Sequence, residues 1–183
     1  MYFIADTHFF HYNIIEYCKR PFSSVDEMNQ TLISNWNSVV KNKDDIVYFL
    51  GDFSFYTTEE KLKWLFSQLN GKIRFIVGNH DRLARKKLRN YAEFVKKCEI
   101  IRYNDKNIML VHYPIFLEKY RDFCITCAPP IIDVVFYAHV HDKLPKNEPD
   151  NFVCLSIENW NYRPVTIEEI CQKKQKIREI LCH

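Results

Sequence analysis

The chain has 183 residues, of which 47% are hydrophobic and 27% are charged, with a formal net charge of +3. These values are typical of one soluble globular domain, spanning residues 1–183. So small a charge does not by itself indicate a nucleic-acid or membrane surface, and no apolar run approaches the ~20 residues of a membrane span. The odd number of cysteines, seven, favours reduced thiols in a cytoplasm over a disulfide framework, and we recognise no signal peptide.

The first half of the chain alternates apolar runs with helical patterns. Residues 2–5 are expected to form a buried strand, and a loop-rich segment follows. Ser24 and Glu27 form a capping-box pair that opens a helix. Its core-facing residues recur at helical spacing: Met28, Leu32, Trp36 and Val39. Strands are expected over residues 46–50 and 73–77, with a helix over about 58–70 between them.

The second half continues this alternation after a basic helical segment that starts at Arg82. Residues 99–103 and 107–111 are predicted to form a hairpin, and strands are expected over 134–138 and 152–157. Residues 113–133 are expected to be irregular, as a lid or an interface. Thr166 and Glu169 form a second capping box that opens a C-terminal helix. Cys124 and Cys127 have redox or zinc spacing, but no second pair accompanies them. The alternation of strand and helix predicts an α/β fold.

Side chains that can bind a metal follow five of the apolar runs. They are Asp6, His8, Asp52, Asn79, His112, His139 and His141, with His80 beside them. Open α/β sheets bind ligands in crevices beyond the carboxyl ends of their strands, so we expect these side chains to converge. Two of the three glycines, Gly51 and Gly78, stand directly before Asp52 and Asn79. There the backbone is expected to turn sharply or to approach another group closely.

Carboxylate, imidazole and amide ligands without thiolate suit a divalent ion such as manganese, iron, zinc or nickel. Seven ligands are too many for one catalytic ion, which takes about three protein groups. They suffice for two ions about 3.5–4 Å apart that share a carboxylate. Such a pair turns a bridging water into a nucleophile and holds phosphoryl oxygens. One histidine at a strand end is more often an ordinary polar residue, but five of the seven histidines follow apolar runs, four runs in all.

Five short motifs resemble, in order, the five blocks of the calcineurin-like metallophosphoesterase family: Asp6-Thr7-His8, Gly51-Asp52, Gly78-Asn79-His80-Asp81, Val111-His112 and Ala138-His139-Val140-His141. The longer run over residues 6–15, with Arg20-Pro21-Phe22, is similar to a subgroup of small bacterial and phage phosphoesterases. The resemblance implies a two-sheet β-sandwich flanked by helices, in four layers, with a dinuclear site at the strand ends. The family usually has glycine where this chain has Ala138, which implies a slightly shifted loop with both imidazoles retained.

The family pattern also implies a role for each ligand. The first ion is expected on Asp6, His8 and His141. The second ion is expected on Asn79, His112 and His139. Asp52 is expected to bridge the two ions.

Five further residues are implied to act around the ions. His80 is expected not to bind metal but to protonate the leaving alkoxide or to stabilise transition-state charge. Asp81 is expected either to orient His80 or to form the N-cap of the basic helix. The subgroup resemblance places His11, Asn13 and Arg20 on the substrate side. For Arg20, a surface salt bridge is an equal alternative.

The resulting hypothesis is a phosphoesterase that depends on two divalent ions per chain, with manganese favoured and iron, zinc or nickel as alternatives. It would hydrolyse a small phosphomono- or phosphodiester, a nucleotide among the candidates, through a metal-bridging hydroxide with His80 as the acid. A nuclease acting on a polynucleotide would use the same chemistry, but the modest charge and the lack of an aromatic and basic stripe disfavour it. A non-catalytic binding module on the same scaffold is the third hypothesis. The oligomeric state stays open.

Overall fold

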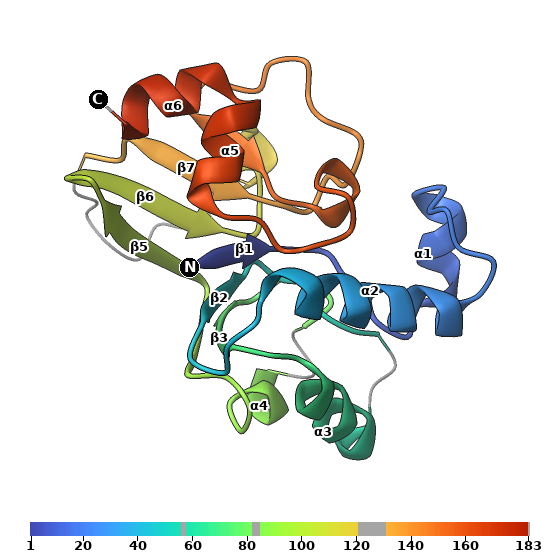
Figure 1. Ribbon diagram of the computed structural model, residues 1–183. Helices are drawn as coiled ribbons and strands as arrows, with labels where there is room; N and C mark the ends of the chain where they lie inside the picture. The colour runs from blue at the N-terminus through green and yellow to red at the C-terminus, as the bar shows by residue number, and fades with distance from the viewer. Residues whose placement is uncertain (56–57, 82–84, 121–130, 183) are drawn as a thin grey trace.

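The computed structural model describes residues 1–55, 58–81, 85–120 and 131–182, which form two sheets with helices around them (Figure 1). The first sheet is parallel throughout, and its strands lie in the order β1 (Tyr2–Ile4), β2 (Ile46–Phe49), β3 (Lys72–Ile76) and β4 (Phe94–Lys96). The second sheet has the order β5 (Cys98–Tyr103), β6 (Lys106–Val111), β7 (Val134–Tyr137) and β8 (Phe152–Cys154). Only the β5–β6 pair of these described strands is antiparallel. The predicted two-sheet α/β architecture is therefore confirmed.

Alternate side chains of the central strands face two separate cores. One set lies between the two sheets and forms the inner core: Phe3, Tyr48, Leu50, Ile108, Leu110, Phe136 and Val153. The other side of the first sheet contributes Ile4, Val47, Phe49, Ile73 and Phe75 to an outer core beneath the helices. Because successive residues of a strand point to opposite faces, strands buried on both sides are apolar at every position. This is why residues 2–5 and 46–50 show no alternation in the sequence.

Two helices cover the outer face of the first sheet, α2 (Val25–Val39) and α3 (Glu59–Gln68) (Figure 1). The side chain of Ser24 accepts a hydrogen bond from the N–H of Glu27, and so begins α2 as predicted. The Glu27 carboxylate accepts from the N–H of Ser23, one residue before the expected partner. Trp36 is fully buried in α2, and its indole N–H donates to the carbonyl of Asn70 at 2.8 Å.

The C-terminal helical region differs from its predicted form. The capping box of Thr166 and Glu169 is present and begins α5 (Ile167–Lys173). The chain then becomes extended at Lys174 (φ −119°, ψ 92°) before α6 (Gln175–Leu181), so one expected helix is two. Both helices pack into the inner core. On the outer face of the second sheet, Ile115 and Phe116 pack against side chains of β6 and β7.

Short elements account for the other differences. The helix α1 (Tyr12–Tyr17) lies where a loop was expected, and its last residue, Tyr17, is 61% exposed. The edge strand β4 was not predicted, and the basic segment contains α4 (Arg85–Leu88), with residues 82–84 outside the description. The predicted β5–β6 hairpin is confirmed and turns at Asn104 and Asp105, both with positive φ. Cys124 and Cys127 fall outside the described residues.

The topology brings the polar strand ends to one region of the molecule. Parallel strands β1, β2 and β3 end at one edge of the first sheet, and parallel β6 and β7 end together in the second. A bridge between Ala5 and Ser156 joins the end of β1 to the segment that follows β8. The candidate ligands of both sheets therefore meet. No described helix combines the length and the apolar character that crossing a membrane requires.

Candidate metal centre

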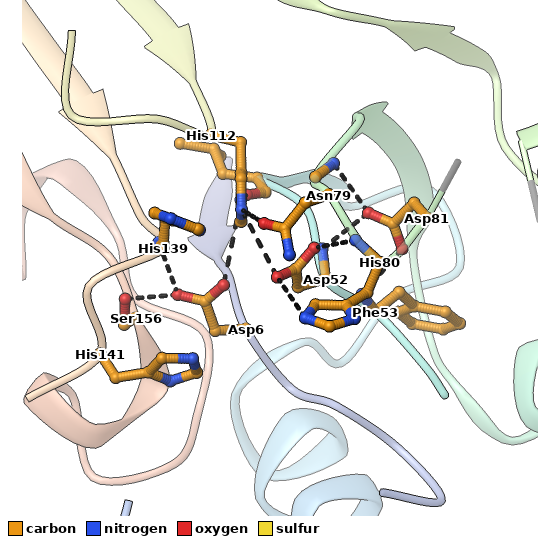
Figure 2. Close-up of polar contacts among 12 residues, drawn as sticks. Asp6, Asp52, Phe53, Asn79, His80, Asp81, His112, His139, His141 and Ser156 are labelled. Carbon is orange, nitrogen blue, oxygen red and sulfur yellow. Dashed lines mark hydrogen bonds and ion pairs between the residues drawn. The ribbon is translucent and has the colours of Figure 1, made fainter. Parts of the chain in front are cut away.

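Three groups of three described side chains each bring one ligand atom per residue to within 4.8 Å of one another, and two of these groups consist of predicted ligands. Figure 2 shows the predicted ligands Asp6, Asp52, Asn79, His112, His139 and His141. Site 1 consists of Asp6, His8 and His141. Site 2 consists of Asp52, His112 and His139. Asn79 also belongs to the surroundings of site 2, because its Oδ1 lies 3.1 Å from Nε2 of His112. The structure thus brings all seven predicted ligands together, and Asp6, His8 and His141 fall in a different group from His112 and His139.

Asp52 lies between the two sites. Its Oδ2 is 3.6 Å from Nε2 of His8, which belongs to site 1. The same oxygen is 3.5 Å from Nε2 of His112, which belongs to site 2. Its other oxygen, Oδ1, is held by the N–H of His80 at 2.9 Å. An oxygen that lies near histidines of both sites is suitably placed to be shared by two ions.

The ligand-bearing turns are strained. Positive φ angles occur at five of the seven candidate ligands: Asp6 (56°), His8 (50°), Asp52 (59°), His139 (77°) and His141 (54°). A residue with a side chain adopts this conformation at a cost of roughly 1–2 kcal/mol. Such strain concentrates at functional sites, where the surrounding structure holds it in place. Here the sharp turns direct side chains from different strands toward one point.

Hydrogen bonds orient each ligand and leave one atom of it directed at the site. Asp6 Oδ2 accepts from the N–H of His139 at 2.9 Å and from the hydroxyl of Ser156, which leaves Oδ1 unused. Nδ1 of His112 lies 2.7 Å from the carbonyl of Leu50, so it donates there and turns Nε2 toward Asp52. Metal-bound histidines commonly donate their second ring N–H in this way.

The donor set fits a divalent cation. Asp6 Oδ1 and His8 Nε2 are buried, and neither has a hydrogen-bond partner among the described residues. A buried polar atom without a partner is costly, and a bound cation would satisfy both atoms of site 1 at once. Carboxylate and imidazole ligands suit manganese, iron, zinc and nickel. The residues therefore fit the ions that the sequence predicts.

The two carboxylates control the pKa values of the histidines around them. Burial disfavours the charged form of His112, but Asp52 and Asp6 outweigh it and raise the pKa to about 9. For His141 the same balance, with Asp6 as the strongest partner, raises the pKa to about 11. Burial and the neighbouring His112 lower the pKa of His139 to about 4. Without metal, protons on His112 and His141 therefore compensate the carboxylates.

Gly51 and Gly78 lie so close to candidate ligands that neither position has room for a side chain. A Cβ on Gly78 would lie 2.1 Å from Asp52 Oδ1, and a Cβ on Gly51 would lie 2.5 Å from His112 Nδ1. Gly51 also has a φ of +89°, which favours glycine. The sequence-based expectation for both glycines is confirmed.

His80 stands at the rim of the centre and belongs to neither site. Its side chain is 36% exposed, and its Nε2 lies 4.0 Å from Asp52 Oδ2. Asp81, expected to orient His80, has a different role. Its carboxylate accepts from the N–H groups of Asp52 (2.6 Å), Gly78 (2.8 Å) and Phe53 (3.0 Å), and so ties the ends of β2 and β3 together. The N-cap alternative concerns residues 82–84, which are not described.

A cavity of about 630 Å³ opens beside both sites, and His11 and Asn13 line it as expected. Arg20 does not line the cavity, and the salt bridge expected as the alternative is present but buried instead of at the surface. Its guanidinium is fully buried and donates to the carbonyls of Asp6 (2.7 Å) and Thr7 (2.8 Å). It also forms an ion pair with Glu158, so it contacts neither substrate space nor solvent.

Sequence reasoning missed three residues that contact the ligands. Ser156 donates to Asp6, Glu158 lies 3.0 Å from Nδ1 of His141, and the Tyr120 hydroxyl lies 2.8 Å from Nε2 of His139. Ser156 and Glu158 follow the apolar run of β8, so the strand-end rule applied elsewhere would have found them. No comparable signal marks Tyr120, which lies in the irregular segment.

A two-sheet fold with carboxylate and imidazole ligands at its strand ends defines a metallophosphoesterase-type protein. Residues 1–155 match the calcineurin-like phosphoesterase superfamily domain, and the chain belongs to this superfamily.

Similar proteins include the uncharacterized protein MJ1445 of Methanocaldococcus jannaschii, 40% identical over 178 residues that cover 96% of this chain and 92% of that protein. The Gene 66 protein of Mycobacterium phage L5 is 39% identical over 83 residues, 44% of this chain and 39% of that protein. Among solved structures, the protein of unknown function AQ665 from Aquifex aeolicus superposes with a TM-score of 0.73 at 28% identity. That match covers 94% of this chain and 98% of that one.

The substitution Asp52→Asn tests the shared position. We expect bound manganese to fall from about two ions per chain to fewer than one, because both sites lose a negatively charged ligand. Elemental analysis after dialysis measures this stoichiometry. The exposed Asp150→Asn serves as the control and is expected to retain the full content. Two tightly held ions in the Asp52→Asn protein would contradict the shared role.

Metal binding should strengthen as pH rises. His112 and His141 have raised pKa values of about 9 and about 11, so both are protonated at pH 7 without metal. Each arriving ion must displace one proton, and the apparent affinity of each site should rise roughly tenfold per pH unit between about pH 6 and pH 8. Calorimetric titration in buffers of different ionisation enthalpy counts the released protons. Binding independent of pH would show that the histidines are already neutral.

Proposed function

We propose that this chain is a phosphoesterase that uses two divalent ions to hydrolyse a small phosphomono- or phosphodiester. The observation that carries the proposal is the position of Asp52, whose Oδ2 lies within 3.6 Å of histidines from both sites. Membership of the calcineurin-like phosphoesterase superfamily supports a hydrolase of this class. Manganese is the favoured ion, with iron, zinc or nickel as alternatives.

Seven side chains would bind the two ions. Asp6, His8 and His141 would hold one ion, and Asn79, His112 and His139 the other, with Asp52 shared. When bound, two such ions lower the pKa of a water to make it a nucleophile and neutralise charge on the phosphoryl oxygens. The chain fixes the separation of the two sites through the anchored carboxylates of Asp6 and Asp52.

His80 is placed to act on the leaving group. Its backbone N–H is fixed on Asp52 Oδ1, and its exposed ring lines the cavity. Aromatic rings surround it, with ring centroids of Phe55 and His8 at 5.1 and 5.2 Å. A positioned imidazole that is not a ligand can donate a proton to the departing oxygen or a hydrogen bond to developing charge.

The cavity favours a small substrate. A volume of about 630 Å³ lies within the range of small-molecule sites. Its lining includes the rings of Tyr17, Phe55 and Tyr120, with the cationic Lys143 among them, which suits an anion that carries an aromatic group such as a nucleotide. A polynucleotide would require a broad basic surface, which a net charge of +3 does not favour. The retained ligands and His80 argue against a non-catalytic binding module.

Hydrolysis assays test the proposal. Metal-replete chain is expected to hydrolyse bis-p-nitrophenyl phosphate, p-nitrophenyl phosphate or both, and to lose this activity in EDTA and regain it with manganese. Failure to turn over either ester while holding two ions would favour the binding module. Cleavage of oligonucleotides with strongly salt-dependent affinity would favour the nuclease.

The substitution His80→Ala tests the acid. We expect it to leave metal content unchanged and to slow turnover by about 10²–10⁴-fold, the usual effect of losing a general acid. The loss should be larger for an alkyl ester than for a p-nitrophenyl ester, because p-nitrophenolate leaves without a proton. His80→Gln is the matched control, since it keeps a hydrogen-bond donor but cannot deliver a proton. Loss of bound metal in either variant would make His80 a ligand or a structural support.

A further inference from the structure

We infer that the buried ion pair of Arg20 and Glu158 positions all three ligands of site 1. The inference rests on the proposed metal-dependent function and assigns a role to two residues that touch no substrate space. Arg20 follows α1, and Glu158 lies in a 3-10 turn (Ile157–Asn159) after β8. They are 138 residues apart, and their side chains are 0% and 4% exposed.

Arg20 fixes the turn that carries the first two ligands. Its Nη2 donates to the carbonyl of Asp6 at 2.7 Å, and its Nη1 donates to the carbonyl of Thr7 at 2.8 Å. These carbonyls are consecutive and lie between Asp6 and His8, both of which have positive φ. The planar guanidinium presents its N–H groups in a rigid fork, so the two bonds determine the orientation of both peptide groups. Arg20 thereby holds a strained turn at the entrance to site 1.

Glu158 fixes the third ligand. Its Oε1 lies 3.0 Å from Nδ1 of His141, and the same oxygen accepts from Nε (3.0 Å) and Nη2 (2.7 Å) of Arg20. A carboxylate beside Nδ1 holds the proton on that nitrogen and directs Nε2 toward the ion. His141 and the Asp6–His8 turn are therefore joined through one carboxylate oxygen and one guanidinium.

Stability alone does not account for this arrangement. Replacing a buried ion pair by apolar residues of similar volume is often neutral or stabilising, so the pair is weak evidence for a purely structural role. Instead, three of its contacts go to groups that carry or border site 1 ligands: the carbonyls of Asp6 and Thr7 and the ring of His141. Cys18 also lies within 4.8 Å of His141 and Glu158 ligand atoms, so direct metal binding by Glu158 is the competing reading.

Manganese titration of the full metal-free chain tests the inference. For Glu158→Leu we expect the affinity of one site to fall about 10–100-fold, the usual effect of losing such a partner, while the other site changes less than about twofold. Glu158→Gln should lower the manganese affinity of that site less, because the amide oxygen of glutamine can still accept from Nδ1–H of His141. Glu148→Gln is the matched control: Glu148 also pairs with a lysine and a hydroxyl, at 3.2 and 2.7 Å, but contacts no candidate ligand.

Removing one charge of a buried pair can unfold the chain, so a second variant is needed. The double substitution Arg20→Met with Glu158→Leu removes both charges and is expected to fold yet show the same loss at one site. In the zinc-loaded unmodified chain, nitrogen NMR should show His141 with a protonated Nδ1 and a metal-bound Nε2, and this fixed tautomer should be lost in the double variant.

Three outcomes separate the possibilities. Unchanged affinity at both sites in the folded double variant would overturn the positioning role while leaving the proposed function intact. Complete loss of an ion from both Glu158 variants, with the His141 tautomer unchanged, would make Glu158 a ligand and also overturn it. An unmodified chain that binds no manganese would overturn the proposed function itself.

Discussion

Burial of two carboxylates is the constraint on which the centre depends. Asp6 and Asp52 are almost completely inaccessible to solvent, and an uncompensated charge in such a place is very costly. Hydrogen bonds from backbone N–H and hydroxyl groups satisfy one oxygen of each acid. Asp6 Oδ2 accepts from the N–H of His139 and the hydroxyl of Ser156. Asp52 Oδ1 accepts from the N–H of His80. The remaining oxygens face imidazoles. In the metal-free chain, protons on His112 and His141 compensate the acids, and cations bound between the acids would do the same.

Several features of the backbone follow from this constraint. The acids and the imidazoles come from strands of two sheets, so each strand has to turn sharply as soon as it ends, and the left-handed residues do this. Because Gly51 and Gly78 have no side chains, the ends of β2 and β3 can lie close to each other and to His112. The Asp81 carboxylate then holds the two strand ends together by accepting hydrogen bonds from three backbone N–H groups. Local strain is thus offset by buried hydrogen bonds that exist only in the assembled fold.

The sequence predicted which candidate ligands lie together because each of them follows an apolar run, which is a local signal. It failed for residues whose roles depend on distant partners. Arg20 was expected on the substrate side or in a surface salt bridge, yet it is buried against Glu158, which lies 138 positions away. Asp81 was assigned to its neighbour His80, whereas its hydrogen bonds reach back to Asp52 and Phe53. Elements as short as β4 and α1 contain too few residues to show a hydrophobic periodicity. The break between α5 and α6 at Lys174 contains neither glycine nor proline, the residues that usually predict such a break.

Each site draws its ligands from both halves of the chain, and this determines when an ion can be captured during synthesis. Asp6 and His8 are synthesised early, but the third member of their group is His141. Asp52 is also synthesised before His112 and His139, the other two members of its group. A nascent chain that ends before residue 139 carries both acids and neither full set of candidate ligands. On the proposed function, cation binding would therefore follow synthesis of the second sheet, and a bound ion would link the two sheets.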